Sequence, residues 1–339
     1  MSKKIEVLIT LPIPDELIEQ VAQVSDKLSV TVLPAREGRE ISSEQWQKAE
    51  VLYTLHTLPL PEQAPNLRWV QTSLAGVDKI RETPLFEKQD LVLTTMSGGN
   101  SSQVAEYVLT MILALGHILP QFLNLQRKKT WMEEKGKNYV PVELRGSTVG
   151  IVGYGSIGRQ VARLVSGFGA AVLGTKRDLM NPGDEGYSTD DMGDPQGDLF
   201  TRLYPPQALR SMVGECDFVV VSVPLTSSTV GLLGKEQLAA MKPSAYLVDI
   251  SRGGVVDHEA LIAALNQEQL AGAALDVFPE EPLPEDSPLW EMSNVIITPH
   301  IAGFSGRYNQ RANDLFVENL GRYLAGEELL NKVDFDREY

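Results

Sequence analysis

Short apolar runs alternate with polar turns and helical patterns along nearly the whole chain. In the first hundred residues, strands are expected at 5–10, 29–34, 51–55, 68–73 and 91–95. Runs of this length, bounded by turn-forming residues, are typical of strands that are buried on both faces of a parallel sheet. Because helical patterns such as residues 14–27 lie between several of them, these runs predict a small open α/β sheet.

A second series of alternating patterns begins at residue 148. Its strands are expected at 148–153, 171–175, 218–223, 245–250, 271–277 and 295–298. Its helices are expected at 156–167, 206–213, 235–241 and 258–267. Six strands with crossover helices predict one doubly wound parallel sheet.

The stretch 178–204, rich in Gly, Pro and Asp, is expected to be a surface loop at the rim of this sheet. It lacks the spacing of a calcium-binding loop, so no metal site is expected.

Two further helices flank the second series and set the expected domain boundaries. Residues 104–127 predict a long apolar helix that links the two sheets. The helical pattern at 307–325 is too short to start a new domain, so we expect it to pack on the first sheet. The first domain is therefore expected to be discontinuous, with residues 1–103 and 304–339, and the second to span residues 104–303.

A glycine-rich turn follows the first strand of the second series. It reads Gly153-Tyr154-Gly155-Ser156-Ile157-Gly158, a G-x-G-x-x-G pattern between an apolar strand and a helix. One glycine makes the tight bend, one lets the backbone approach a pyrophosphate, and one lets helix and strand pack closely. The start of the helix offers free N–H groups to the phosphates. In this context the pattern predicts a dinucleotide-binding Rossmann domain.

Three polar residues follow the carboxyl ends of later strands in the same series. Arg252, Glu281 and His300 each come shortly after a predicted strand, and this edge is where open α/β sheets bind ligands. Arginine can hold a carboxylate with two hydrogen bonds, and histidine can donate a proton to a carbonyl oxygen. A carboxylate beside the histidine favours its protonated form. One such residue alone is usually structural, but the three together indicate hydride chemistry on a carbonyl.

Composition narrows the class of protein. The chain has 339 residues, is 43% hydrophobic and carries a formal net charge of -15, which is typical of a soluble globular protein without a nucleic-acid partner. Its one cysteine, Cys216, allows no disulfide within the chain. The most apolar stretch, 104–123, contains Glu106, His117 and Pro120. We therefore expect a buried or interface helix there, no membrane span and a cytoplasmic protein.

Several segments resemble the D-isomer-specific 2-hydroxyacid dehydrogenase family, and the resemblance covers nearly the whole chain. They are S-L-A-G-V-D at 73–78, Asn100 with V-A-E-Y at 104–107, R-G at 145–146 and P-L-T-S-S-T at 224–229. The resemblance implies a flavodoxin-like substrate domain and a Rossmann cofactor domain that close over a cleft. It implies that the catalytic residues are Arg252, Glu281 and His300. It also implies substrate contacts at Leu74, Ala75, Gly76, Val77, Asn100 and Arg252.

The same resemblance implies NAD(P) as the cofactor, with Asp276 at the position that contacts the nicotinamide amide. The expected cofactor contacts are Val104, Gly153, Tyr154, Gly155, Ser156, Ile157, Gly158, Lys176, Arg177, Val223, Pro224, Thr229, Ile250, Ser251, Arg252, Asp276, His300 and Gly303. NAD-preferring members have an acidic residue at the end of the second cofactor strand, where this chain has Lys176 and Arg177. The basic pair predicts a preference for NADP, and the alternative is that Asp178 takes the acidic role.

The leading interpretation is an enzyme that interconverts a small 2-keto acid and a D-2-hydroxy acid, with His300 as acid and base. Glyoxylate and hydroxypyruvate are the expected substrates. A homodimer is expected because the helix over 104–123 is more apolar than a linker needs and Trp131 follows it.

Two alternatives stay open at this point. One is a phosphoglycerate dehydrogenase, although the chain ends without the regulatory domain that many of these enzymes carry. The other is a non-enzymatic dinucleotide sensor, like the corepressors that resemble this family. The intact set of Arg252, Glu281 and His300 disfavours the sensor. Formate dehydrogenases share the fold, but they typically have glutamine at the position of Glu281.

Overall fold

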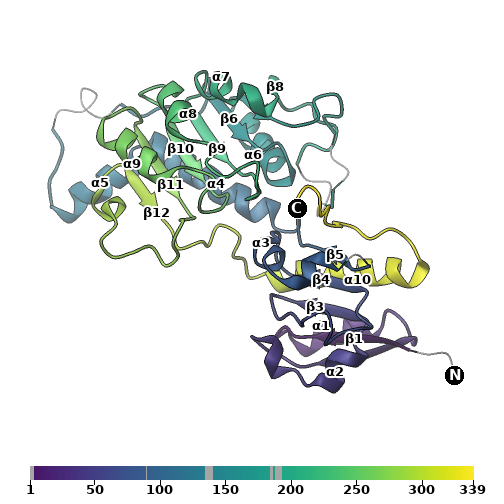
Figure 1. The fold of residues 1–339 in the computed structure, drawn as a ribbon. Helices are drawn as coiled ribbons and strands as arrows, with labels where there is room; N and C mark the ends of the chain where they lie inside the picture. Colours follow the sequence, from purple (N-terminus) through teal and green to yellow (C-terminus); the bar gives the residue numbers. More distant parts are fainter. Residues whose placement is uncertain (1–3, 89, 134–139, 184–185, 188–192) are drawn as a thin grey trace. The chain divides into compact units, whose positions relative to one another are not determined.

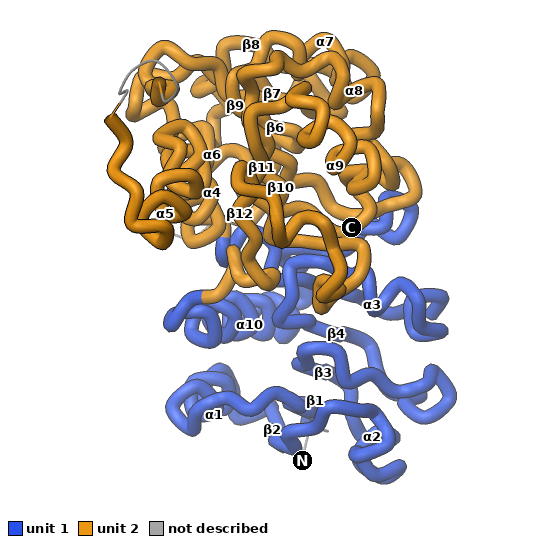
Figure 2. Tube along the Cα trace, turned by 90° about the vertical axis from the view of Figure 1, so that its left-hand side faces the viewer, with its two compact units in different colours: residues 1–100, 305–339 blue, residues 101–304 orange. Residues whose placement is uncertain are grey.

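The computed structural model describes residues 4–88, 90–133, 140–183, 186–187 and 193–339. The chain forms two compact units, each built on a parallel sheet. The first unit comprises Met1–Asn100 and Ser305–Tyr339, and the second comprises Ser101–Phe304 (Figure 2). The α/β class predicted from the alternating pattern is confirmed.

The first unit contains a five-stranded parallel sheet with the order β2-β1-β3-β4-β5. This is the strand order of flavodoxin-like folds. The strands are β1 (Ile5–Ile9), β2 (Leu28–Val32), β3 (Val51–Thr54), β4 (Trp69–Thr72) and β5 (Val92–Thr94). The helices are α1 (Asp15–Ala22), α2 (Ser43–Lys48), α3 (Asp78–Arg81) and α10 (Tyr308–Ala325), with the 3-10 helices η1 (Gly38–Glu40) and η2 (Pro84–Glu87).

Helices cover both faces of this sheet, which explains why most residues of its strands are apolar. On one face, α1 and α10 contribute Val21 and Phe316 to an apolar cluster. On the other face, α2 and α3 contribute Trp46 and Ile80. The chain thus returns to its first unit at α10 (Figure 1), where the ring of Phe316 stacks on Tyr53 with centroids 4.2 Å apart.

The second unit contains a seven-stranded parallel sheet with the order β12-β11-β10-β9-β6-β7-β8. The chain winds outward from β6 in both directions, which is the Rossmann arrangement. The strands are β6 (Thr148–Val152), β7 (Ala171–Thr175), β8 (Arg202–Tyr204), β9 (Phe218–Val221), β10 (Tyr246–Asp249), β11 (Gly272–Leu275) and β12 (Val295–Ile297). The helices are α4 (Ser101–Gly116), α5 (Leu119–Arg127), α6 (Ser156–Gly167), α7 (Leu209–Val213), α8 (Lys235–Ala240) and α9 (His258–Asn266), with η3 (Pro206–Ala208) and η4 (Pro288–Glu291). Side chains of α4 and α6 pack on one face, and those of α7, α8 and α9 pack on the other.

The structure differs from the sequence prediction at two places in this unit. β8 lies within the stretch 178–204, which the composition predicts to be a loop throughout. This strand has only three residues, and it is defined by its pairing with β7 rather than by an apolar pattern. The single helix predicted over 104–127 is two helices, α4 and α5, with a bend of 65°. Ile118 between them has a left-handed φ of 49°, and Pro120 near the start of α5 has no N–H to continue the bonds of α4.

The described part of the chain has no single helix that is long and apolar enough to cross a membrane. α4 and α5 reach such a length only as a pair, across their bend. Within the same described residues, no three His, Cys, Asp or Glu side chains gather in a way that would hold a metal ion.

Candidate active site

The glycine-rich turn joins β6 to α6, and its three glycines are needed for different reasons. Gly153 has a φ of 100°, and a Cβ there would lie 2.8 Å from Cγ1 of Val223. A Cβ on Gly158 would lie 2.3 Å from the carbonyl oxygen of Gly153, so this glycine allows α6 to pack against the turn. Gly155 faces open space and precedes α6 without a side-chain cap. The first N–H groups of α6 are therefore available to an anion.

Neighbouring strands hold this turn in place. Thr175, the last residue of β7, accepts a hydrogen bond from the N–H of Tyr154 at its carbonyl oxygen (2.8 Å) and one from the N–H of Gly153 at its hydroxyl (2.9 Å). Ser222, just after β9, donates its hydroxyl to the carbonyl oxygen of Gly153 at 3.1 Å. The strand that fixes the turn is thus also the strand that leads into Lys176.

The residues that follow β7 form the part of the site expected to contact the adenosine ribose. The amine of Lys176 donates to the carbonyl oxygen of Gly183 at 2.8 Å. Asp178 accepts hydrogen bonds from the N–H groups of Met180 and Asn181 and from the Asn181 side chain at 2.7 Å. These bonds, led by the one from the Asn181 side chain, lower the pKa of Asp178. The carboxylate of Asp178 is thus engaged within its own turn.

Most described residues of the loop between β7 and β8 are exposed or half-buried, as expected of a surface loop, but the loop also has a buried anchor. Asp194 is 2% exposed and accepts a hydrogen bond from the phenol of Tyr154 at 2.7 Å. Arg159 of α6 is equally buried and donates to the carbonyl oxygens of Asp194 and of two residues earlier in the loop. Because Tyr154 belongs to the glycine turn, the loop is packed onto that end of the site. Anchors between distant residues leave no periodic signal in the composition of a loop.

His300 and Glu281 form a hydrogen-bonded pair. Nδ1 of His300 lies 2.9 Å from Oε2 of Glu281. The other carboxylate oxygen of Glu281 accepts a hydrogen bond from the N–H of Phe278 at 3.0 Å, which fixes its orientation. The imidazole side chain is 44% exposed. Since Nδ1 is held by the carboxylate, Nε2 is the ring nitrogen that can exchange a proton with a ligand.

Asp276, buried after the end of β11, organises the segment that carries His300. Its carboxylate accepts hydrogen bonds from the hydroxyl of Thr298 (2.6 Å) and from the N–H groups of Ile301 and Ala302 (2.9 Å each). These bonds lie on both sides of His300, whose φ is 54°. Such a backbone conformation is uncommon for a residue with a side chain, so it depends on support from its surroundings. The resemblance assigns Asp276 to the nicotinamide amide, and the structure adds this supporting role.

Arg252 lies on the turn that follows β10. Its Nη1 donates to the carbonyl oxygen of Ser251 at 2.8 Å, and the N–H and hydroxyl of Ser251 donate to Oδ1 of Asp249 at 3.0 and 2.5 Å. A Cβ on the next residue, Gly253, would lie 2.0 Å from the carbonyl oxygen of Phe278. The Arg252 turn therefore packs closely on the segment whose backbone holds Glu281. Strands β10, β11 and β12, which carry the three predicted catalytic residues, are neighbours in the sheet.

The predicted substrate loop belongs to the first unit and follows β4. It consists of Leu74, Ala75, Gly76 and Val77. The N–H of Leu74 donates to the hydroxyl of Thr72 at 3.1 Å, and its carbonyl oxygen accepts from the N–H of Met96 at 2.9 Å. Tyr308 of α10 donates its phenol to the carbonyl oxygen of Ser73. The start of this loop is therefore held from three sides within its own unit.

The other predicted contacts lie at the ends of helices and strands. Asn100 precedes α4, and Val104 is buried within that helix. Tyr107 of α4 shares a hydrogen bond of 2.6 Å with the hydroxyl of Thr298, and burial raises the pKa of Tyr107 to about 12. Sequence reasoning missed the roles of Tyr107 and Thr298, although Tyr107 ends the V-A-E-Y motif and Thr298 lies two residues before His300. The remaining residues are Ser156 and Ile157 at the start of α6, Arg177 after β7, Val223, Pro224 and Thr229 after β9, Ile250 after β10, and Gly303 after the His300 segment.

A Rossmann unit with a glycine-rich turn, and a histidine–carboxylate pair beyond strands of the same sheet, together define a nicotinamide-dependent dehydrogenase. The chain belongs to the D-isomer specific 2-hydroxyacid dehydrogenase family, whose NAD binding domain matches residues 109–302. This confirms the resemblance noted from the motifs, and the protein is an NAD(P)-dependent 2-hydroxyacid dehydrogenase.

Similar proteins include enzymes and a solved structure. The chain is 31% identical to a glyoxylate reductase of Korarchaeum cryptofilum, over 98% of this chain and 96% of that protein. It is 29% identical to a D-3-phosphoglycerate dehydrogenase of Methanocaldococcus jannaschii, over 97% of this chain but 59% of that protein. The crystal structure of a D-isomer specific 2-hydroxyacid dehydrogenase from Xanthobacter autotrophicus Py2, in complex with NADPH and MES, is 30% identical, with a TM-score of 0.82 over 100% of both chains.

Proposed function

We propose that the chain reduces a small 2-keto acid, such as glyoxylate or hydroxypyruvate, to the 2-hydroxy acid, with NADPH as the hydride donor. The observation that carries this proposal is the pairing of His300 with Glu281 at 2.9 Å. It holds a proton donor beyond the carboxyl ends of the strands of a dinucleotide-binding sheet, where ligands bind. The similarity to a glyoxylate reductase of nearly the same length supports a small substrate.

The glycine turn fits a dinucleotide. A Cβ at Gly155 would project into open space beside the uncapped start of α6, and a pyrophosphate needs such a space next to free N–H groups. Gly153, Gly155 and Gly158 would hold the pyrophosphate with the first turn of α6, and Asp276 would hold the nicotinamide amide. The bound cofactor supplies the hydride for the reduction.

The protein side chains bind the substrate and move the proton. His300 donates a proton from Nε2 to the carbonyl oxygen of the substrate, while Glu281 keeps the ring in place through Nδ1. Arg252 holds the substrate carboxylate with two hydrogen bonds, and the loop 74–77 offers backbone N–H groups to the same carboxylate. In this proposal residues 1–103 and 304–339 form the substrate domain, and residues 104–303 form the cofactor domain, which also supplies Arg252 and His300.

Lys176 and Arg177 support a preference for NADPH over NADH. Both are basic and follow Thr175 at the end of β7, where a ribose 2′-phosphate is expected. Asp178, the alternative ribose contact, already accepts three hydrogen bonds within its own turn. The similar structure from Xanthobacter autotrophicus contains NADPH, which also supports this preference.

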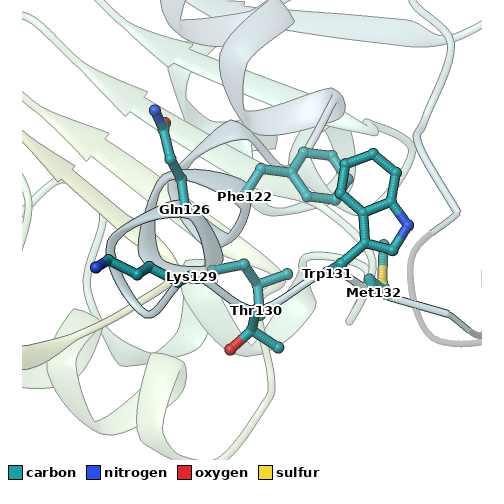
Figure 3. Close-up of a pocket in the computed structure, with 7 residues that line it drawn as sticks. Phe122, Gln126, Lys129, Thr130, Trp131 and Met132 are labelled. Atoms are coloured by element: carbon teal, nitrogen blue, oxygen red, sulfur yellow. The ribbon is translucent and has the colours of Figure 1, made fainter.

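We also propose that two copies of the chain pair through α5 and the segment after it. Figure 3 shows the side chains that line a hollow there, among them Phe122, Trp131 and Met132. Trp131 is 80% exposed, and Leu119 and Leu123 of α5 are 44% and 45% exposed. Clustered apolar side chains that are this exposed are typical of a surface that a partner covers. Light scattering at micromolar concentration should give twice the monomer mass, and the monomer mass would exclude the dimer.

Turnover of NADPH with a panel of 2-keto acids tests the proposed reaction. We expect the absorbance of the reduced nicotinamide to fall with glyoxylate or hydroxypyruvate. A strong preference for the phosphorylated three-carbon keto acid would favour a phosphoglycerate dehydrogenase instead. NADPH binding without turnover of any keto acid would favour the dinucleotide sensor.

A further inference from the structure

Asp249, the last residue of β10, is a buried carboxyl that has no role in the proposed chemistry. It is 0% exposed. The alternation of side chains along β10 places it on the same face as Leu247. Its partners in the neighbouring strands, Val221 and Leu275, belong to the same apolar cluster as Leu247. Burial in these surroundings raises the pKa of Asp249 to about 7, and the charge of Asp276 adds to the rise.

The carboxyl of Asp249 is joined to Arg252 by a short chain of hydrogen bonds. Oδ1 accepts both the N–H and the hydroxyl of Ser251, and the carbonyl oxygen of Ser251 accepts from Nη1 of Arg252 at 2.8 Å. Oδ2 is buried and has no hydrogen-bond partner among the described residues. Asp249 therefore fixes the peptide that holds the Arg252 side chain.

We propose that Asp249 is a positioning residue, which directs the guanidinium of Arg252 through Ser251 and controls, by its own charge, the affinity for an anionic substrate. The inference rests on the proposed role of Arg252 in holding the substrate carboxylate. Neutral Asp249 holds Ser251 without adding a charge beside Arg252. Ionised Asp249 adds a negative charge next to that turn, which attracts the guanidinium and repels the incoming anion.

The other ionisable groups on the neighbouring elements have different tasks. Asp276, after β11, accepts three hydrogen bonds from the His300 segment. Asp257 caps α9 by accepting the N–H of Ala260 at 3.0 Å. Burial lowers the pKa of His258, which follows it. Among these groups, Asp249 is therefore the one whose raised pKa brings its change of charge near neutral pH. Glu281 and His300, on the segment packed against the Arg252 turn, are the same in every Asp249 and Asp257 variant and in the wild type.

The test is the KM for glyoxylate at saturating NADPH, measured from pH 6 to pH 9. We expect the wild-type KM to rise about fivefold over this range as a buried negative charge appears close to the anion site. Asparagine keeps an acceptor for Ser251 but cannot ionise, so Asp249→Asn should keep the low KM at every pH. Alanine removes the acceptor, so Asp249→Ala should raise the KM at every pH.

A matched control comes from the same segment. Asp257→Asn alters a carboxylate that caps α9, and it should keep the wild-type KM profile. NADPH affinity, measured by fluorescence titration, should be the same in the wild type, Asp249→Asn and Asp257→Asn, because all three keep an acceptor for Ser251, which is an expected cofactor contact. A KM profile of Asp249→Asn that rises with pH as in the wild type would overturn the control by charge. A wild-type KM in Asp249→Ala would overturn the positioning role, and if that variant does not fold, the Asn variant still decides the inference.

Arg252→Lys distinguishes a failure of this inference from a failure of the proposed function. An unchanged KM in Arg252→Lys would remove Arg252 from substrate binding, and with it the basis of both proposals. A raised KM in Arg252→Lys, together with unaltered behaviour of both Asp249 variants, would overturn only the role of Asp249.

Discussion

The second unit builds the two ends of its candidate site in different ways. At the glycine turn the site is made of backbone: Gly153 bends the chain, Gly158 admits α6, and Gly155 leaves open space. At the other end it is made of side chains, with Glu281 on the ring of His300 and further hydrogen bonds around it. The glycine turn depends on the absence of Cβ atoms, whereas the other end depends on the hydrogen bonds of polar side chains. The two should therefore fail under different substitutions.

The largest expected effect separates chemistry from cofactor binding. His300→Ala should lower kcat by roughly 10²–10⁴, the usual contribution of a general acid. NADPH affinity should change little, because the glycine turn is untouched. Stopped-flow or steady-state reduction of glyoxylate measures the first quantity, and fluorescence titration measures the second. His117→Ala, at the exposed break between α4 and α5, is the matched control and should keep wild-type kcat. Near-normal turnover in His300→Ala would remove His300 from the mechanism.

A second substitution changes the cofactor end and leaves the catalytic end intact. Lys176→Asp should reverse or abolish a preference for NADPH, because the new carboxylate repels the 2′-phosphate and accepts the ribose hydroxyls. A charge-assisted hydrogen bond contributes about 1.5–3 kcal/mol, so the two basic residues should favour NADPH by about tenfold to a few hundredfold after solvent screening. The ratio of kcat/KM for the two cofactors measures this. A wild type that already prefers NADH would make Asp178 the better candidate for the ribose contact.

The third prediction uses two glycine substitutions. It tests whether the cofactor end of the site depends on the absence of Cβ atoms. Gly155→Ala adds a Cβ in open space, so the fold should hold while the KM for NADPH rises about tenfold through crowding of the pyrophosphate. Gly158→Ala places a Cβ 2.3 Å from a backbone carbonyl oxygen, so it should lower the Tm as well. Gly167→Ala, also in open space but at the far end of α6, is the control. Equal NADPH affinity in Gly155→Ala and the control would contradict this interpretation.

The same contrast explains how far the sequence could predict the structure. The glycine turn and the strand-end residues Arg252, Glu281 and His300 were accessible because their signals are local: a motif, or a polar residue after an apolar run. The anchor of Arg159 and Asp194 was not, because it joins residues 35 apart through a backbone carbonyl. The bond between Tyr107 and Thr298 spans 191 residues. Such contacts become visible only when the sheet has brought its elements together.

The helix and strand boundaries were likewise predictable where their signal is local and not where it depends on distant contacts. α6 begins and ends at the predicted residues, because its apolar periodicity and the glycine turn both mark it. β8 was missed because three residues at a sheet edge carry no pattern. The break between α4 and α5 was missed because apolar residues continue through it. Pro120, in the first turn of α5, is the local signal that marks this break.

The last expected effect concerns stability rather than turnover and follows from the buried carboxyl of Asp249. Burial raises its pKa from 3.8 to about 7 in the folded chain. Well below pH 3.8 the group is protonated in both the folded and the unfolded state. As the pH rises toward 7, the carboxyl ionises first in the unfolded chain, so the wild type loses stability over this window, and its stability levels off above it.

Asparagine has no such loss, and the Tm of Asp249→Asn minus that of the wild type should therefore increase from pH 4 to pH 8. We expect an increase of roughly 10 °C, since a pKa shift of this size corresponds to about 4 kcal/mol and 1 kcal/mol shifts the Tm of a domain of this size by about 2–4 °C. Calorimetry of both proteins without cofactor measures the difference, with Asp257→Asn as the control. A difference in Tm that does not change with pH would show that Asp249 is ionised in the folded chain throughout this range.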